Sequence, residues 1–471
     1  MTDERRPGLQ WRLLGTIGLG TLLNPLNSSM IAVALIDIRL AFDVDFASTS
    51  WLIASYYLAS AVGQPLLGRL GDLVGRRRVF LVGLAVVAVA SSVAPFAPSF
   101  AALVAIRILQ ALGTSALFPS GLGIVRSTHG PGQARALGVL SVFASTSAAI
   151  GPTIGGYLVA WGGWPAIFIV NLPIIALCGS LALLTLPRDA VAAPVRVTVR
   201  RLDLPGAALF VLTALSALWW LMSLTGQVAW LALGAAVLSA AGLIVVERRV
   251  RRRASPEKAD VSAAALTEPF LDFAALGGRG GLLSIYAMNA AVNIVFYAIF
   301  FGVPSYLQST AGQSAAEAGL TMLPLAALSV LITPVSARLI DRYGAGVVLR
   351  SGALLLAAGC AGILVLQETW PIAALGALLG LLGTANGAVS LALQTAMYDA
   401  AAGPAIGSAA GLFQTSRYVG TMLASTLLAL TFGQELDLTA LHTLAAVLTA
   451  VMVLVLGGLV VAARARRRDH P

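Results

Sequence analysis

Long uninterrupted runs of apolar residues, separated by short polar segments, dominate the chain. Each run reaches about 20 residues, the length that a helix needs to cross the hydrocarbon core of a bilayer. Apolar and polar positions do not alternate as they do in the strands of a membrane β-barrel, so the runs predict helices. The fourteen runs lie near residues 12–38, 50–70, 79–97, 101–126, 136–160, 165–186, 204–224, 228–246, 282–308, 318–337, 347–366, 371–397, 405–432 and 441–463.

The composition strengthens this interpretation. Of the 471 residues, 58% are hydrophobic and only 11% are charged, whereas about a quarter of the residues in a soluble domain are charged. The apolar runs take up so much of the chain that no sizeable soluble domain remains. We therefore predict an all-α polytopic membrane protein with fourteen transmembrane helices.

Residues typical of enzymes or metal sites are scarce. The two cysteines, Cys178 and Cys360, fall inside apolar runs and have neither the spacing of a disulfide framework nor that of a metal site. Gly121 and Gly123 lack the context of a nucleotide-binding loop, and no nucleophile–base pair is evident. We expect no enzyme activity, no metal and no bound cofactor.

Positively charged residues gather in alternate loops. Among the opposite loops, which are mostly acidic, only Arg39 is basic. Because positive residues stay on the cytoplasmic side of membrane proteins, we predict an inner-membrane protein with both termini in the cytoplasm. This topology accounts for the net charge of +10 without nucleic-acid binding. The basic clusters lie near residues 5–12, 76–78, 126–135, 188–201, 248–253, 338–350 and 464–468.

A polar segment after the eighth run divides the helices into unequal parts. We predict an N-terminal six-helix bundle (1–187), a basic linker with two inserted helices (188–281) and a C-terminal six-helix bundle (282–471). The basic loops on both sides of the inserted pair require a hairpin that enters and leaves at one face. The loop around Asp341 weakly repeats the loop around Asp72, as expected of a transporter built from two halves.

The most specific motif lies in the loop after the second run. Its residues resemble the signature loop of the major facilitator superfamily, and the matching positions are Gly68, Leu70, Asp72, Gly75, Arg76 and Arg77. Asp72 lies near a helix C-terminus, where a negative charge is disfavoured, so it needs a cation or a helix N-terminus as partner. The resemblance implies a conformational latch between two bundles, with Asp341 as the counterpart in the second half. A solvated turn is the alternative.

The fifth run carries Gly151, Pro152, Gly155 and Gly156 after Ser147. This segment resembles the superfamily motif associated with export, with Ser147 in place of the leading glycine. Proline removes a backbone donor and bends a helix, and glycines permit tight helix packing. The resemblance implies an antiporter, and the alternative is an ordinary helix kink.

Two arginines, Arg107 and Arg417, fall well inside apolar runs, away from the run ends, where a charge is costly and indicates function. Arg107, in a segment that continues to Gln110 and Gly113, resembles a superfamily motif implicated in proton movement. Arg417 is a weaker candidate in the thirteenth run. Capping of carbonyls or pairing with a carboxylate is the alternative role for Arg107.

The first run departs from the apparent relatives. The segment around Asn27 and Met30 resembles one that normally has aspartate where Asn27 stands. Asparagine cannot titrate, and Asp37 lies about 15 Å further along the helix axis. Asp37 therefore becomes the candidate for proton coupling, and a substrate pocket built for dications is not expected.

The ninth run is rich in amides and aromatic rings. Asn289, Asn293 and Phe296 recur on one helical face, with Tyr297 beside them. Such a face suits an amphiphilic organic ligand, and interhelical packing is the alternative. The candidate substrate pocket comprises Asn27, Met30, Asn289, Asn293, Phe296, Tyr297 and Gln414.

The order of these motifs along the chain resembles the fourteen-helix drug:proton antiporters of the major facilitator superfamily. The resemblance implies two six-helix bundles plus an inserted pair, and proton-driven export of hydrophobic or amphiphilic compounds by a monomer embedded in the lipid bilayer. Export or flipping of a lipid-like molecule and a transport-inactive membrane sensor are the alternatives.

Overall fold

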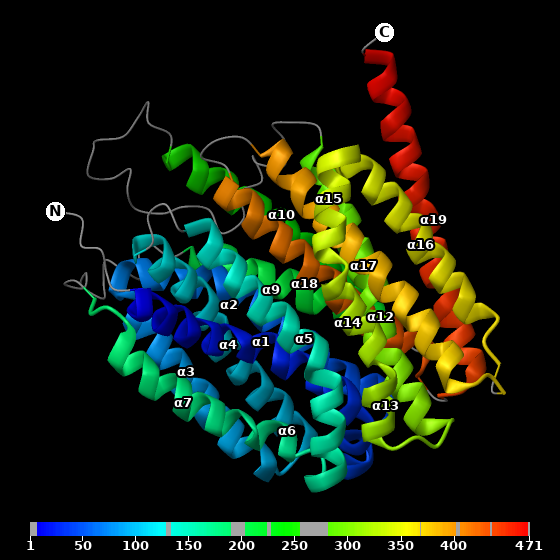
Figure 1. Ribbon diagram of the computed structural model, residues 1–471, viewed down its shortest axis with the longest axis horizontal. Coiled ribbons are helices and arrows are strands. Elements are labelled where there is room, and N and C mark those ends of the chain that lie inside the picture. Colours follow the sequence, from blue (N-terminus) through cyan, green and yellow to red (C-terminus); the bar gives the residue numbers. More distant parts are fainter. Residues whose placement is uncertain are drawn as a thin grey trace. The chain divides into compact units, whose positions relative to one another are not determined.

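The computed structural model describes residues 7–128, 133–189, 203–223, 228–254, 281–367, 369–401, 406–433 and 436–469. Every regular element in these ranges is a helix (Figure 1). Residues 190–202, 224–227 and 255–280 of the predicted linker, including Arg196, Arg200 and Arg201, lie outside the described residues. The prediction of an all-α fold is confirmed.

The helices before the linker follow the predicted runs closely. They are α1 (Pro7–Phe42), α2 (Phe46–Val74), α3 (Arg76–Val93), the short η1 (Ala94–Phe96), α4 (Phe100–Thr128), α5 (Gln133–Gly162), α6 (Ala166–Ile169) and α7 (Asn171–Thr185). The sixth predicted helix is thus divided into α6 and α7.

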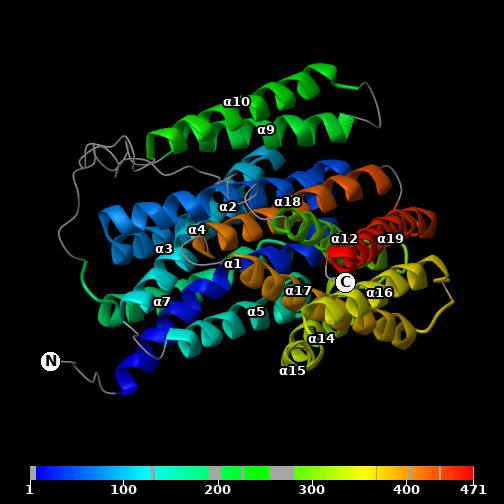
Figure 2. The ribbon, with the colours of Figure 1, turned by 90° about the horizontal axis from the view of Figure 1, so that it is seen from above.

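The remaining helices include the inserted pair, α9 (Leu204–Met222) and α10 (Trp230–Ala254), which pack along each other (Figure 2). Pro205 near the start of α9 and the side chain of Asp203, which accepts a hydrogen bond from the Gly206 N–H, fix the beginning of this hairpin. The other helices are α12 (Leu282–Ser309), α13 (Ala315–Thr321), α14 (Leu323–Leu331), α15 (Thr333–Tyr343), α16 (Ala345–Leu364), α17 (Ile372–Ala400), α18 (Ile406–Thr431) and α19 (Leu438–Asp469).

Membrane-spanning length recurs along the described part of the chain. Eleven helical segments there are long and apolar enough to cross a bilayer. One of these segments, Ala315–Tyr343, consists of α13, α14 and α15. It is broken next to Pro324 and Pro334, since proline removes a backbone donor. The other predicted spans correspond to α2, α5 and α18, which have 29, 30 and 26 residues.

Contacts between residues divide the chain into two compact units. Unit 1 contains Met1–Ser28, Ser55–Ala148 and Pro165–Phe273, and unit 2 contains Ser29–Ala54, Ala149–Trp164 and Ala274–Pro471. Unit 2 therefore includes one end each of α1, α2 and α5, together with the helices after the linker. The boundaries predicted from the sequence at 187 and 281 stay a prediction.

Each unit has its own packed interior. In unit 1, α3 packs against α4 and α7 around Phe80, Leu117 and Cys178. In unit 2, α12 packs against α18 and α19, and α17 packs against α14 and α16. Apolar side chains also face outward over many of the helices, as expected of a surface that contacts lipid.

Candidate functional site

A buried cluster of polar side chains joins five helices of unit 1. Asn27 of α1 and Asn171 of α7 donate reciprocal hydrogen bonds, each from Nδ2 to the other's Oδ1, at 2.9 and 2.8 Å. Gln110 of α4 donates to Oδ1 of Asn27 at 3.0 Å and to Oγ of Ser91 on α3 at 3.1 Å. The amide of Asn27 thus has partners on α4 and α7, which fixes its orientation.

Arg107 extends this cluster toward α2. Its Nη1 donates to Oε1 of Gln110 at 2.7 Å, and its guanidinium carbon lies 4.2 Å from the centre of the Tyr56 ring, in a cation–π contact. The Arg107 side chain is only 1% exposed. Among the described residues it forms no ion pair, and its Nε–H has no hydrogen-bond partner. Arg107 is therefore a buried cation whose neighbours are amides and rings.

The members of this cluster that the sequence did not single out as site residues are Tyr56, Ser91, Gln110 and Asn171. Tyr56 also joins the cluster to α1, because its hydroxyl lies 3.2 Å from the carbonyl oxygen of Asn24 and 3.2 Å from Oγ1 of Thr114. The sequence signal that could have identified these four residues is a polar side chain inside an apolar run. No such local signal predicts the pairing of Asn27 with Asn171, because the two positions are 144 residues apart.

The signature loop is held within unit 1. Asp72 and Arg76 form an ion pair at 2.8 Å, and Nη1 of Arg76 donates to the carbonyl oxygen of Gly123 on α4. Gly75 has a φ of 113°, a conformation that favours glycine. A latch between the two predicted bundles stays a prediction, as does the part assigned to Gly68, Arg77 and Asp341.

Asp189 is a contributor to this loop that the sequence did not suggest. Its carboxylate accepts hydrogen bonds from the backbone N–H groups of Arg77 at 3.0 Å and of Arg78 at 2.9 Å. These groups are the unpaired donors at the start of α3, where a negative charge is favourable. The segment after α7 is thereby attached to the signature loop.

The glycines of α5 lie in unit 2, in close contact with α13. Gly156 faces the carbonyl group of Ala315 and Gly319 faces that of Pro152, so neither glycine has room for a Cβ atom. Oγ1 of Thr153 donates to the carbonyl oxygen of Gly319 at 3.1 Å. The two helices thus touch backbone to backbone, as small residues allow in membrane proteins.

Two further contacts in unit 2 join other helices. Gly155 packs on Met30 of α1, and a Cβ on Gly155 would lie 3.0 Å from the Met30 Cα. The ring centres of Phe46 and Phe432 are 5.6 Å apart, which joins the start of α2 to the segment after α18. On the predicted topology these ends face the outside. In unit 2, therefore, helices from before and after the linker meet closely at that end.

Asn289 of α12 binds to α18 of the same unit, and Asn293 donates to Asn289 within α12. Nδ2 of Asn289 donates to the carbonyl oxygen of Phe413 and to Oγ of Ser416, both at 2.9 Å. Nη2 of Arg417 donates to the hydroxyl of Tyr297 at 3.0 Å. Asn289 and Asn293 are buried, so these contacts also serve packing between the two helices.

The aromatic part of α12 forms a contiguous group of rings. The rings of Phe296 and Phe300 stack with centres 5.6 Å apart, and those of Tyr297 and Phe301 stack at 5.8 Å. Gln414 is partly exposed on α18, and Asp37 is partly exposed on α1. It stays a prediction that Gln414 and the α12 side chains line a substrate pocket. The part of Asp37 in proton coupling also stays a prediction.

Comparison with known proteins covers nearly the whole chain. The sequence profile of the Major Facilitator Superfamily matches residues 17–425. An uncharacterized MFS-type transporter of Bacillus subtilis, YwoD, is 41% identical over 91% of each chain. The tetracenomycin C resistance and export protein of Streptomyces glaucescens is 32% identical over 89% of this chain and 76% of its own.

A solved structure supports the fold independently. The crystal structure of a point mutant of the nucleoside transporter NupG superposes with a TM-score of 0.65 at 14% identity, and the match covers 96% of this chain and 99% of the other. At this low identity the likeness concerns the fold alone.

Proposed function

Because the chain belongs to the Major Facilitator Superfamily, we propose that it exports hydrophobic or amphiphilic small molecules from the cytoplasm by alternating access. The buried cluster around Arg107 and Asn27 carries this proposal, because polar and charged groups at membrane depth are costly and indicate a transport path. The similarity to a tetracenomycin C export protein supports the outward direction. The proline and glycines of α5 are consistent with that direction.

We also propose that the proton gradient drives export. The protein would act as an antiporter, with Asp37 of α1 carrying the proton. Asp37 is the carboxylate that α1 carries, ten residues after Asn27 in the sequence. The protein would be a monomer of the inner membrane, with fourteen spans and both termini in the cytoplasm. The basic loops support this orientation.

Reconstitution of the full chain into proteoliposomes tests the proposal directly. A panel of hydrophobic and amphiphilic compounds is assayed for transport with and without an imposed pH gradient. We expect transport of at least one amphiphilic compound, accelerated by the gradient. A transport rate that does not change with the pH gradient would contradict proton coupling. Absence of transport for every compound would contradict the export proposal.

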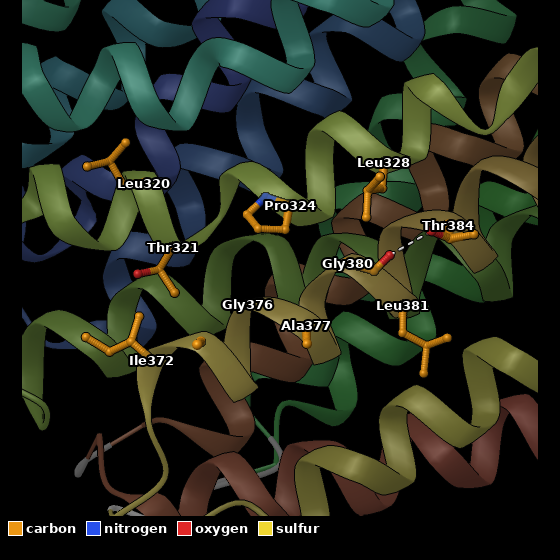
Figure 3. A pocket seen from close by; sticks show the side chains of 11 residues that line it. Leu320, Thr321, Pro324, Leu328, Ile372, Gly376, Ala377, Gly380, Leu381 and Thr384 are labelled. Atoms are coloured by element: carbon orange, nitrogen blue, oxygen red, sulfur yellow. Dashed lines mark hydrogen bonds between the residues drawn. The ribbon is translucent and has the colours of Figure 1, made fainter.

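A lipid-like substrate is the second candidate. An apolar groove of about 770 Å³ runs between α13, α14 and α17 in unit 2. Figure 3 shows Leu320, Pro324 and Leu328 along one side and Ala377 and Leu381 along the other. Its lining suits an acyl chain better than a polar solute. A fluorescent phospholipid in the same transport panel distinguishes the two candidates.

Replacing Asp72 with asparagine is expected to reduce export without reducing membrane abundance. The substitution removes the ion pair with Arg76, and a latch between conformations is worth about 1–3 kcal/mol, the usual size of such a coupling. Export rate is measured at equal abundance, with Asp399→Asn, at the exposed end of α17, as a matched control. Unchanged export by Asp72→Asn would contradict the latch.

Replacing Asn27 with aspartate is expected to add transport of lipophilic cations and a new pH dependence. Oδ1 of residue 27 already accepts hydrogen bonds from Gln110 and Asn171, so a carboxylate there would be hydrogen-bonded and titratable. The native amide offers no charge to attract a cation. Substrate range and pH profile are compared with those of Asn386→Asp, which adds a carboxylate in the middle of α17. An unchanged range and profile in Asn27→Asp would be contrary to this interpretation.

A further inference from the structure

Arg107 is a charged side chain inside a membrane-spanning helix, the eighth residue of α4. Among the described residues, no carboxylate forms an ion pair with it. Asp37, Asp72 and Asp341 lie toward the ends of their helices, and Glu247 is buried in α10. A molecule that reaches Arg107 therefore meets a positive charge that no described carboxylate pairs with.

The surroundings of Arg107 leave its charge in place. Its partners are Gln110, the Tyr56 ring and, at 6.0 Å, the Phe168 ring. The Gln110 amide leads on to Asn27 and Asn171, which are both neutral. Amides orient the guanidinium and rings stabilise it, but none of these groups cancels its charge.

One donor of the guanidinium is also unused. Nη1 donates to Gln110, whereas the buried Nε–H has no partner among the described residues. A buried donor without an acceptor costs free energy. A carboxylate approaching the Nε–H would supply both the missing acceptor and the missing negative charge, and arginine binds carboxylates with well-defined geometry.

We infer that this transporter selects amphiphilic organic anions, with a carboxylate group, over cations of the same size, and that Arg107 is the specificity-determining residue. The inference rests on the proposed export function, whose substrate class it narrows. Arg107 is closed off in this structure, so the anion reaches it when the transport cycle opens the cluster. Asn27 contributes by leaving the charge of Arg107 free to act on the substrate.

A matched set of three ligands tests this selectivity by binding alone. Pyrenebutyrate, pyrenebutanol and pyrenebutylamine share a ring and a chain and differ in the charge of the end group. Binding to the purified full-length protein in detergent is followed by energy transfer from tryptophan to pyrene, and the neutral alcohol gives the baseline for partition into the micelle. We expect pyrenebutyrate to bind saturably and about tenfold or more tightly than the amine.

Two variants assign the effect to Arg107. Arg107→Gln removes the positive charge. Asn27→Asp keeps Arg107 but places a negative charge on the other side of the Gln110 amide. Each variant is expected to weaken pyrenebutyrate binding about tenfold or more. Asn27→Asp keeps the test decisive if Arg107→Gln fails to fold. Asn386→Asp, with its new carboxylate in the other unit, is expected to bind pyrenebutyrate as the native protein does.

The outcomes separate the inference from the function on which it rests. Equal or tighter binding of the amine, absence of saturable pyrenebutyrate binding, or binding unaffected by both variants would overturn the anion selectivity. Selective binding of pyrenebutyrate without transport of any compound in proteoliposomes would support the site and contradict the export function. Transport of neutral or cationic compounds without anion binding would support the export function and contradict the anion site.

Discussion

Replacing Gly156 with valine is expected to reduce export about tenfold or more, the scale of a strong conformational coupling, while the protein still inserts into the membrane. Gly156 of α5 and Ala315 of α13 touch through their backbones, and a Cβ at Gly156 would overlap the Ala315 carbonyl group. The helices must separate to accept the larger side chain, because overpacked interfaces are destabilising. The conformation in which these ends are closed is therefore depopulated.

The separation can be measured as well as the export rate. Cys178 and Cys360 are replaced with serine, a single cysteine is introduced by Ala316→Cys, and its labelling by a membrane-impermeant maleimide is followed from outside. We expect faster labelling in Gly156→Val than in the parent protein. Gly179→Val is the control, since no atom lies within 4 Å of a Cβ built there. Equal labelling and export in the two valine variants would disprove the role of the α5–α13 contact.

Replacing Arg107 with alanine is expected to abolish export and leave thermal stability broadly unchanged. Breaking a buried ion pair is strongly destabilising, because the remaining charge is left without a partner. Among the described residues, Arg107 has no carboxylate partner to leave behind. Its removal instead takes away a buried cation, together with one hydrogen bond to Gln110.

Two measurements are needed to interpret this variant. Transport is assayed in proteoliposomes, and the melting temperature is measured in detergent by intrinsic fluorescence. Lost export with a melting temperature close to that of the native protein would agree with a functional arginine. A large fall in melting temperature and abundance would instead show that Arg107 mainly holds α4 in place.

Helix type and position followed from the sequence because apolar length is a local property. The sequence also identified Arg107 and Asn27 individually, from a charge and an amide inside apolar runs. It did not pair Asn27 with Asn171, because that contact depends on how α1 and α7 are rotated toward each other. Helical periodicity inside a membrane does not fix this rotation when apolar residues occur on all faces.

Breaks and caps were harder to predict for a different reason. The division of one predicted helix into α13, α14 and α15 follows from Pro324 and Pro334. A prediction based only on the length of an apolar run does not detect such breaks. Asp189 caps α3 from a segment more than 100 residues away, so it has no local signal. The resemblance to drug exporters of the superfamily is confirmed by the comparisons, whereas substrate and coupling ion depend on side-chain contacts that differ between relatives.

The α9–α10 hairpin has a consequence for the gene as well as for the protein. The two helices pack along each other, and on the predicted topology the chain returns to the face from which it entered. A DNA segment encoding such a pair can be gained or lost without inverting any helix encoded downstream. Loss of a single helix would turn every later loop to the wrong side of the membrane. In-frame exchange of α9 and α10 between related genes is thus compatible with inheritance of all the other helices.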